Sequence, residues 1–169
     1  MSSDFKFAVA EAMQQTEVTA SIEKLYVEVG NQISSRKPIC DISGRCCRFE
    51  EYGHRLFVTT MEMGAFIAGL KRGQVEKYDS PPKLSVHLSQ WDSTGCPFQV
   101  QKLCTVHPIR PFGCRMFFCD PSATNWQQDQ YEIFHAKLKT LHQTLHIPYF
   151  YVEWRWALAE CLPILQENV

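Results

Sequence analysis

The chain has 169 residues, 45% of them hydrophobic, which suits one domain (1–169) with a substantial core. A formal net charge of -1 gives no basic field that would recruit nucleic acid or a membrane surface. No apolar run approaches the roughly 20 residues that span a bilayer, and the N-terminal segment lacks the pattern of a secretory signal. These features predict a cytoplasmic protein with no membrane partner, and nucleic-acid binding is not expected.

The first half of the chain predicts two helices and one strand. Apolar residues at intervals of three and four predict an amphipathic helix over about 5–35. The apolar run 56–58 predicts a short buried strand. Thr59 and Glu62 then form a Thr-x-x-Glu capping box, which predicts a helix that begins there and ends near Gly73.

The second half predicts a polar connecting loop over 74–95 and two C-terminal helices within 125–166. Asn125 favours the start of the first, and its apolar face consists of Tyr131, Phe134, Leu138, Leu141 and Leu145. The last helix is expected from about Val152, with Pro163 kinking or dividing it and with Trp154, Leu158, Leu162 and Leu165 facing inward. The predicted fold is mainly α with small irregular or β elements, and its helices scaffold two cysteine-rich metal-binding loops.

Seven of the eight cysteines fall in two short blocks, CDISGRCC and CPFQVQKLCTVHPIRPFGCRMFFC. Glycine and proline interrupt any regular element in both blocks, so both are expected to be loop-like. Loops give thiolates the freedom to point at a common centre, and reduced cytosolic thiols favour metal or redox roles over disulfides. The candidate metal ligands are Cys40, Cys46, Cys47, Cys96, Cys104, Cys114 and Cys119.

The spacings indicate a metal site without specifying the metal. Zinc takes four thiolate or imidazole ligands, and a [4Fe–4S] cluster also takes four thiolates. Seven thiols exceed one such set, so either two metals bind or some thiols only pack. The side chains of adjacent Cys46 and Cys47 are expected to diverge, which disfavours both binding one ion. The surplus of thiols favours an iron–sulfur cluster slightly over zinc.

Other residues near the blocks have competing interpretations. Arg110 and Arg115 are candidate cofactor-binding residues, because a guanidinium group stabilises a nearby thiolate, although ordinary surface charge explains them equally well. His107 is a candidate ligand or an ordinary loop histidine. Cys161 is expected in the core, where free cysteines are common.

The motifs CDISGRCC, CPFQ, CTVHPIRP and CRMF, with the Thr-x-x-Glu helix start, resemble the CxxCxxCC family. This family is the zinc- or iron-chelating domain of YkgJ-like cysteine cluster proteins, and the resemblance spans about 40–119. It implies metal chelation, and some relatives look like parts of flagellin lysine methylases. Ser43 stands where the family has its second cysteine, and we suggest that Cys119 replaces the lost ligand.

Three functions therefore remain open from the sequence. The first is a cytosolic protein that holds an iron–sulfur cluster or zinc through cysteine thiolates, with a redox or accessory role beside a protein partner. The second is an enzyme component, such as a protein-modifying methyltransferase. The third is a metal-free thiol redox sensor. A disulfide framework is the remaining alternative, and the lack of a signal sequence weighs against it.

Overall fold

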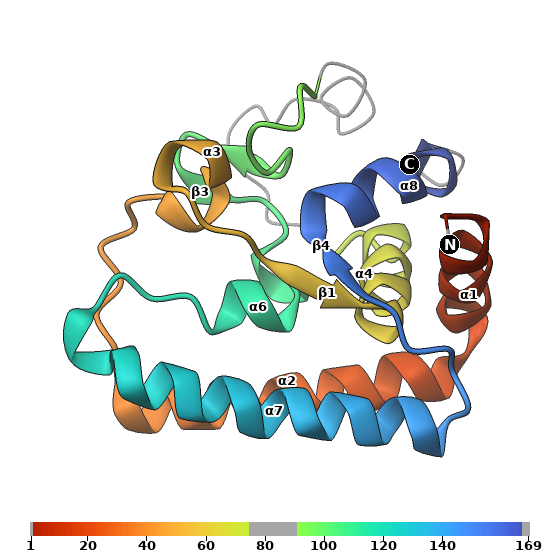
Figure 1. Cartoon of the computed structure of the whole chain (residues 1–169), viewed down its shortest axis with the longest axis horizontal. Helices are drawn as coiled ribbons and strands as arrows, with labels where there is room; N and C mark the ends of the chain where they lie inside the picture. The colour runs from red at the N-terminus through yellow and green to blue at the C-terminus, as the bar shows by residue number, and fades with distance from the viewer. Residues whose placement is uncertain (1, 75–90, 167–169) are drawn as a thin grey trace.

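The computed structural model describes residues 2–74 and 91–166, without the side chains of 162, 165 and 166. The predicted loop over 74–95 lies mostly outside these residues, as do the side chains of Leu162 and Leu165. Helices dominate, as predicted: the fold is mainly α with two small antiparallel strand pairs (Figure 1).

The N-terminal segment forms two helices, α1 (Ser2–Gln14) and α2 (Thr16–Arg36). The prediction of one continuous helix over 5–35 is therefore wrong. The chain is extended at Gln15, with φ -88° and ψ 111°. Because of this break, α1 and α2 bury most of their apolar residues in two different core clusters. The spacing of apolar residues runs on across the break, so periodicity alone did not reveal it.

Helix α4 (Thr60–Lys71) lies at the centre of the molecule and contributes to both core clusters. The predicted capping box is confirmed. The Thr59 hydroxyl accepts from the backbone N–H of Glu62, and the Glu62 carboxylate accepts from the backbone N–H of Thr59. The predicted end is also confirmed, because Gly73 takes the left-handed conformation (φ 68°) just beyond the helix. The chain there is held by the bond from the Gln74 N–H to the Gly69 carbonyl.

Strand β1 (Phe57–Thr59) confirms the predicted strand, shifted by one residue, and pairs antiparallel with β4 (Tyr151–Glu153). The sequence did not predict β4, and the expected start of the last helix near Val152 is wrong for this reason. Helix α8 (Trp154–Gln166) begins only after the strand. It continues through Pro163, which does not divide it.

Helix α7 (Thr124–Thr144) confirms the predicted helix in this region and runs antiparallel beside α2 (Figure 1). Lys137 of α7 forms an ion pair with Glu28 of α2 at 2.7 Å. The two cysteine blocks lie at one end of the molecule, away from the chain termini (Figure 1). Their short elements are η1 (Arg45–Cys47), α3 (Phe49–Tyr52), β2 (Gln99–Val100), β3 (Leu103–Cys104), η2 (His107–Ile109), α6 (Phe112–Arg115) and η3 (Pro121–Ala123).

Candidate metal centre

Direct hydrogen bonds join the two cysteine blocks. The Cys96 N–H donates to the Cys47 carbonyl at 2.8 Å. The Gln99 side-chain amide donates to the Gly44 carbonyl, also at 2.8 Å. These bonds link segments about fifty residues apart in sequence, so the protein chain itself brings the two sets of thiols together.

Gly44 allows the close approach of the two blocks. Its φ of +71° lies in the left-handed region, which side chains with a Cβ disfavour. A Cβ at this position would lie 2.4 Å from Nε2 of Gln99 and 3.1 Å from Cα of Lys102. A side chain here would therefore displace the Gln99 amide and crowd the backbone at Lys102.

Five of the seven candidate ligands line one small cavity of about 20 Å³. A single water molecule needs about 10–15 Å³ on this measure, so the space is of the order of one water or one ion. Apolar side chains and one arginine complete the wall. The lining residues are Cys46, Cys47, Phe49, Cys96, Cys104, Val106, Arg110, Pro111, Cys114 and Trp154.

The sulfur atoms of Cys46 and Cys47 lie 3.8 Å apart, so the expectation that these side chains diverge is wrong. Both residues lie in the single turn of η1, and their side-chain rotamers bring the two thiols together. Four thiolates about 2.3 Å from a tetrahedral zinc ion would lie about 3.8 Å from one another. The two sulfurs are therefore already at the separation that such an ion requires.

Hydrogen bonding among the thiols splits their pKa values. The Cys47 thiol interacts with the sulfurs of Cys46 and Cys96, which raises the pKa of Cys47 and lowers that of Cys46 to about 7. The interaction of Cys96 with Cys47 likewise lowers the pKa of Cys96. Burial raises the pKa of Cys104 to about 12 and that of Cys114 well above its ordinary value. Within this group, Cys46 and Cys96 are thus the thiols most readily ionised.

Arg110 supplies a positive charge in the cavity wall. Its Nε is buried and has no hydrogen-bond partner. Burial dominates the raised pKa values of Cys104 and Cys114, and the charge of Arg110 acts in the opposite direction on both. Arg110 therefore offsets part of the cost that burial imposes on a thiolate in this cavity.

Arg115, the other predicted cofactor-binding residue, is not among the residues that line the cavity. It donates to the carbonyls of Arg110 and Pro108, at 2.9 and 2.6 Å. Its guanidinium carbon lies 4.0 Å from the centre of the Tyr26 ring. Arg115 therefore braces the loop that carries Arg110.

Besides capping α4, Glu62 bonds to residues beside the second cysteine block, which the sequence did not predict. Its buried carboxylate accepts from the Phe112 N–H at 2.8 Å and from the Tyr26 hydroxyl at 3.0 Å, in addition to its bonds with Thr59. Phe112 begins α6, which carries Cys114. Glu62 thus connects the start of α4 to the second cysteine block and to α2.

Cys40 and Cys119 do not line the cavity. Cys40 is exposed, and the nearby backbone N–H of Ile39 donates to Asp120 at 3.0 Å. The Cys119 sulfur lies 3.9 Å from the Ser43 hydroxyl, so Cys119 is beside the position where the family resemblance lacks its cysteine. The eighth cysteine, Cys161, is fully buried in the core, as predicted.

Among the residues that the structure describes, no group of three or more His, Cys, Asp or Glu side chains is arranged around a common metal position. The donor set nevertheless suits a soft metal, since five thiols share one cavity with a cationic side chain.

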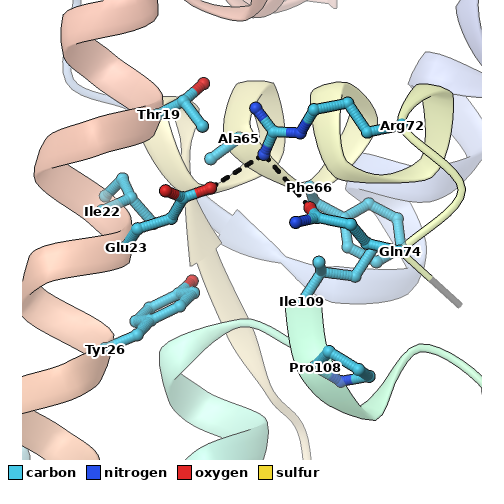
Figure 2. Close-up of a pocket in the computed structure, with 10 residues that line it drawn as sticks. All are labelled: Thr19, Ile22, Glu23, Tyr26, Ala65, Phe66, Arg72, Gln74, Pro108 and Ile109. Carbon is cyan, nitrogen blue, oxygen red and sulfur yellow. Dashed lines mark hydrogen bonds and ion pairs between the residues drawn. The ribbon is translucent and has the colours of Figure 1, made fainter. Parts of the chain in front are cut away.

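A second cavity, of about 130 Å³, lies between α2, α4 and the turn η2. Figure 2 shows Glu23 and Gln74 directed toward Arg72, which bonds to them at 2.8 and 3.1 Å. The wall of this second cavity includes Ile109, which lies on the turn between Cys104 and Arg110. This cavity shares no lining residue with the thiol cavity but adjoins the same loop.

No protein-family model, curated protein or solved structure matches the chain. The resemblance to the CxxCxxCC family therefore stays a prediction that rests on the motifs quoted above. In the described part of the chain, no helix has the length and apolar character needed to cross a membrane.

Proposed function

We propose that the chain is a metal-binding protein that holds one tetrahedral ion, zinc, in the thiol cavity. The observation that carries the proposal is the convergence of five cysteines from both blocks on a single cavity of about 20 Å³. Cys46, Cys47 and Cys96, whose thiols interact, provide three of the ligands. Either Cys104 or Cys114 provides the fourth.

The separation of the Cys46 and Cys47 sulfurs and the small cavity volume favour one ion over a cluster. The 3.8 Å between the sulfurs of Cys46 and Cys47 matches two ligands of one tetrahedral zinc ion. A [4Fe–4S] cluster places each thiolate on a different iron and adds its own irons and sulfides, so the cavity would have to expand. The iron–sulfur alternative would use the same thiols, and the identity of the bound metal separates the two.

A closed site with four thiolates suits a structural role, in which metal binding contributes directly to folding. The ion would hold the two cysteine blocks together as a module for interaction with a protein partner. Arg110 would offset part of the negative charge of four thiolates around a divalent ion. We place this protein in the cytoplasm, where thiols stay reduced.

Titration of the reduced, metal-free protein with Co²⁺ under anaerobic conditions tests the proposal. We expect saturation at one equivalent, with the intense visible bands of tetrahedral cobalt and the charge-transfer absorption of thiolate ligands. One equivalent of Zn²⁺ should abolish these bands. Protein whose thiols have been alkylated under denaturing conditions is the control. Absence of tetrahedral cobalt bands in correctly folded protein would contradict the proposal.

A metal-free redox sensor is the second candidate, because Cys47 and Cys96 line one cavity and their thiols interact. Hydrogen peroxide would accept two electrons and two protons from this pair, giving one disulfide and two molecules of water. Counting free thiols before and after peroxide treatment tests this function. An unchanged count in folded, metal-free protein would exclude it.

A further inference from the structure

Trp154 forms part of the wall of the thiol cavity, although the periodicity of the last helix predicts only that it faces inward. It is the first residue of α8 and is 1% exposed. The ring of Phe66 packs edge-on against its indole, with centroids 5.0 Å apart, and Phe98 lies at 6.4 Å. These contacts restrict the indole to one orientation.

The indole N–H of Trp154 is buried and has no hydrogen-bond partner of ordinary geometry. A buried tryptophan N–H normally finds a partner, so this donor requires an explanation. Among the side chains that line the cavity, Arg110 is a donor only, and the remaining polar groups are thiols. A thiolate is therefore the side-chain acceptor that the cavity offers.

Cys96 is the thiol that this donor faces. Cys96 lines the same cavity as Trp154, and its sulfur interacts with the indole N–H. The backbone of Cys96 is held by its bond to the Cys47 carbonyl. A metal ion would hold this sulfur as a thiolate, a stronger acceptor than a thiol.

We infer that Trp154 donates its indole N–H to the metal-bound sulfur of Cys96 and so orients this ligand and lowers the charge on its sulfur. The inference rests on the proposed function, because it concerns a group that acts on a ligand of the same site. Hydrogen bonds of this kind, from outside the coordination sphere, fix ligand geometry and tune the metal. Trp154 is thus a positioning residue.

The experiment removes the N–H while keeping the shape of the side chain. Trp154 is replaced by 3-benzothienylalanine, an isostere with sulfur in place of the N–H, and in a second variant by Trp154→Phe. We expect the affinity for Zn²⁺, measured by competition with a chromophoric chelator, to fall about tenfold. The charge-transfer band of the Co²⁺ form should move to lower energy, because the sulfur loses a hydrogen bond.

Trp156→Phe is the matched control, since Trp156 lies on the same helix and packs against Phe5 at 5.2 Å, away from the cavity lining. Its Zn²⁺ affinity and its cobalt spectrum should equal those of the wild type. A purely structural role for Trp154 would leave the charge-transfer energy of folded variants unchanged.

The outcomes separate the two claims. If wild-type protein binds no metal, both the proposed function and this inference fail. If it binds metal and the benzothienylalanine variant has the same affinity and the same band position, the inference fails and the proposed function stands. The isostere keeps the test decisive even if Trp154→Phe does not fold.

Discussion

The Cys47 thiol lines the cavity and lies 3.8 Å from that of Cys46, whereas Cys119 lies outside the cavity. Replacing each by serine therefore distinguishes a ligand from a neighbour. We expect Cys47→Ser to lose stoichiometric metal, because an ion in the cavity would lose one of its thiolates. Cys119→Ser should keep one ion per chain. Elemental analysis of both variants, purified in parallel with the wild type, is the measurement.

The opposite result for Cys119 would be informative. Loss of metal from Cys119→Ser would mean that the loop around Ser43 joins the coordination sphere. Cys119 would then replace the cysteine that the family resemblance lacks at position 43, and the assignment of the ligands to the five cavity thiols would be wrong.

Arg110 provides a second test at the residue scale. We expect Arg110→Gln to weaken Zn²⁺ binding about tenfold, because the variant removes a positive charge from the wall of an anionic site. Competition with a chromophoric chelator measures this loss. Arg45→Gln is the control: Arg45 is exposed and lies over the Tyr52 ring rather than in the cavity lining. Equal affinities of the two variants would show that Arg110 has no specific role.

At the scale of elements, Glu62 joins α4 to α2 and α6. Glu62→Gln should lower the free energy of unfolding by about 1–3 kcal/mol, because an amide nitrogen would face a backbone N–H that the carboxylate now accepts from. Chemical denaturation followed by circular dichroism measures this. Glu51→Gln is the control, since Glu51 is exposed.

The effect of Glu62 also depends on pH in a definite direction. Burial raises the pKa of this carboxyl above its ordinary value of 4.5. The stability that protonated Glu62 contributes is therefore complete below the pKa of the unfolded chain and is lost as pH rises through the folded pKa. The stability deficit of Glu62→Gln relative to wild type should shrink across that window. A deficit that grows with pH would contradict this account.

Two glycines separate backbone strain from crowding between the cysteine blocks. Gly44 and Gly53 have similar φ values, +71° and +64°, but only a Cβ at Gly44 would meet atoms within 4 Å. Both alanine variants should lose about 1 kcal/mol from conformational strain. Gly44→Ala should lose more and should also bind Zn²⁺ more weakly, because the second block has to move. Equal unfolding free energies and equal affinities would show that the close approach is unimportant.

For the whole molecule, local signals in the sequence predicted the helical class, the capping box and the end of α4. These features depend on neighbouring residues, which the sequence displays directly. The break at Gln15 and the pairing of β4 with β1 depend on distant packing, and a three-residue strand gives little periodicity to detect.

In the candidate site too, features that depend on neighbouring residues could be predicted from the sequence, and features that depend on distant packing could not. Clustering of cysteines predicted which residues gather, and the structure brings five of the seven to one cavity. The close approach of the Cys46 and Cys47 sulfurs depends on side-chain rotamers, which residue spacing does not encode. Trp154 enters the wall from α8, far from both blocks in sequence, so no motif indicates it.

The proposed zinc site is tested by the metal content of the full chain, purified anaerobically without chelators or affinity-metal resin and measured by elemental analysis. We predict one zinc ion per chain and no stoichiometric iron. Several irons per chain would replace the single ion by a cluster held by the same thiols. Folded protein with no stoichiometric metal would contradict the account.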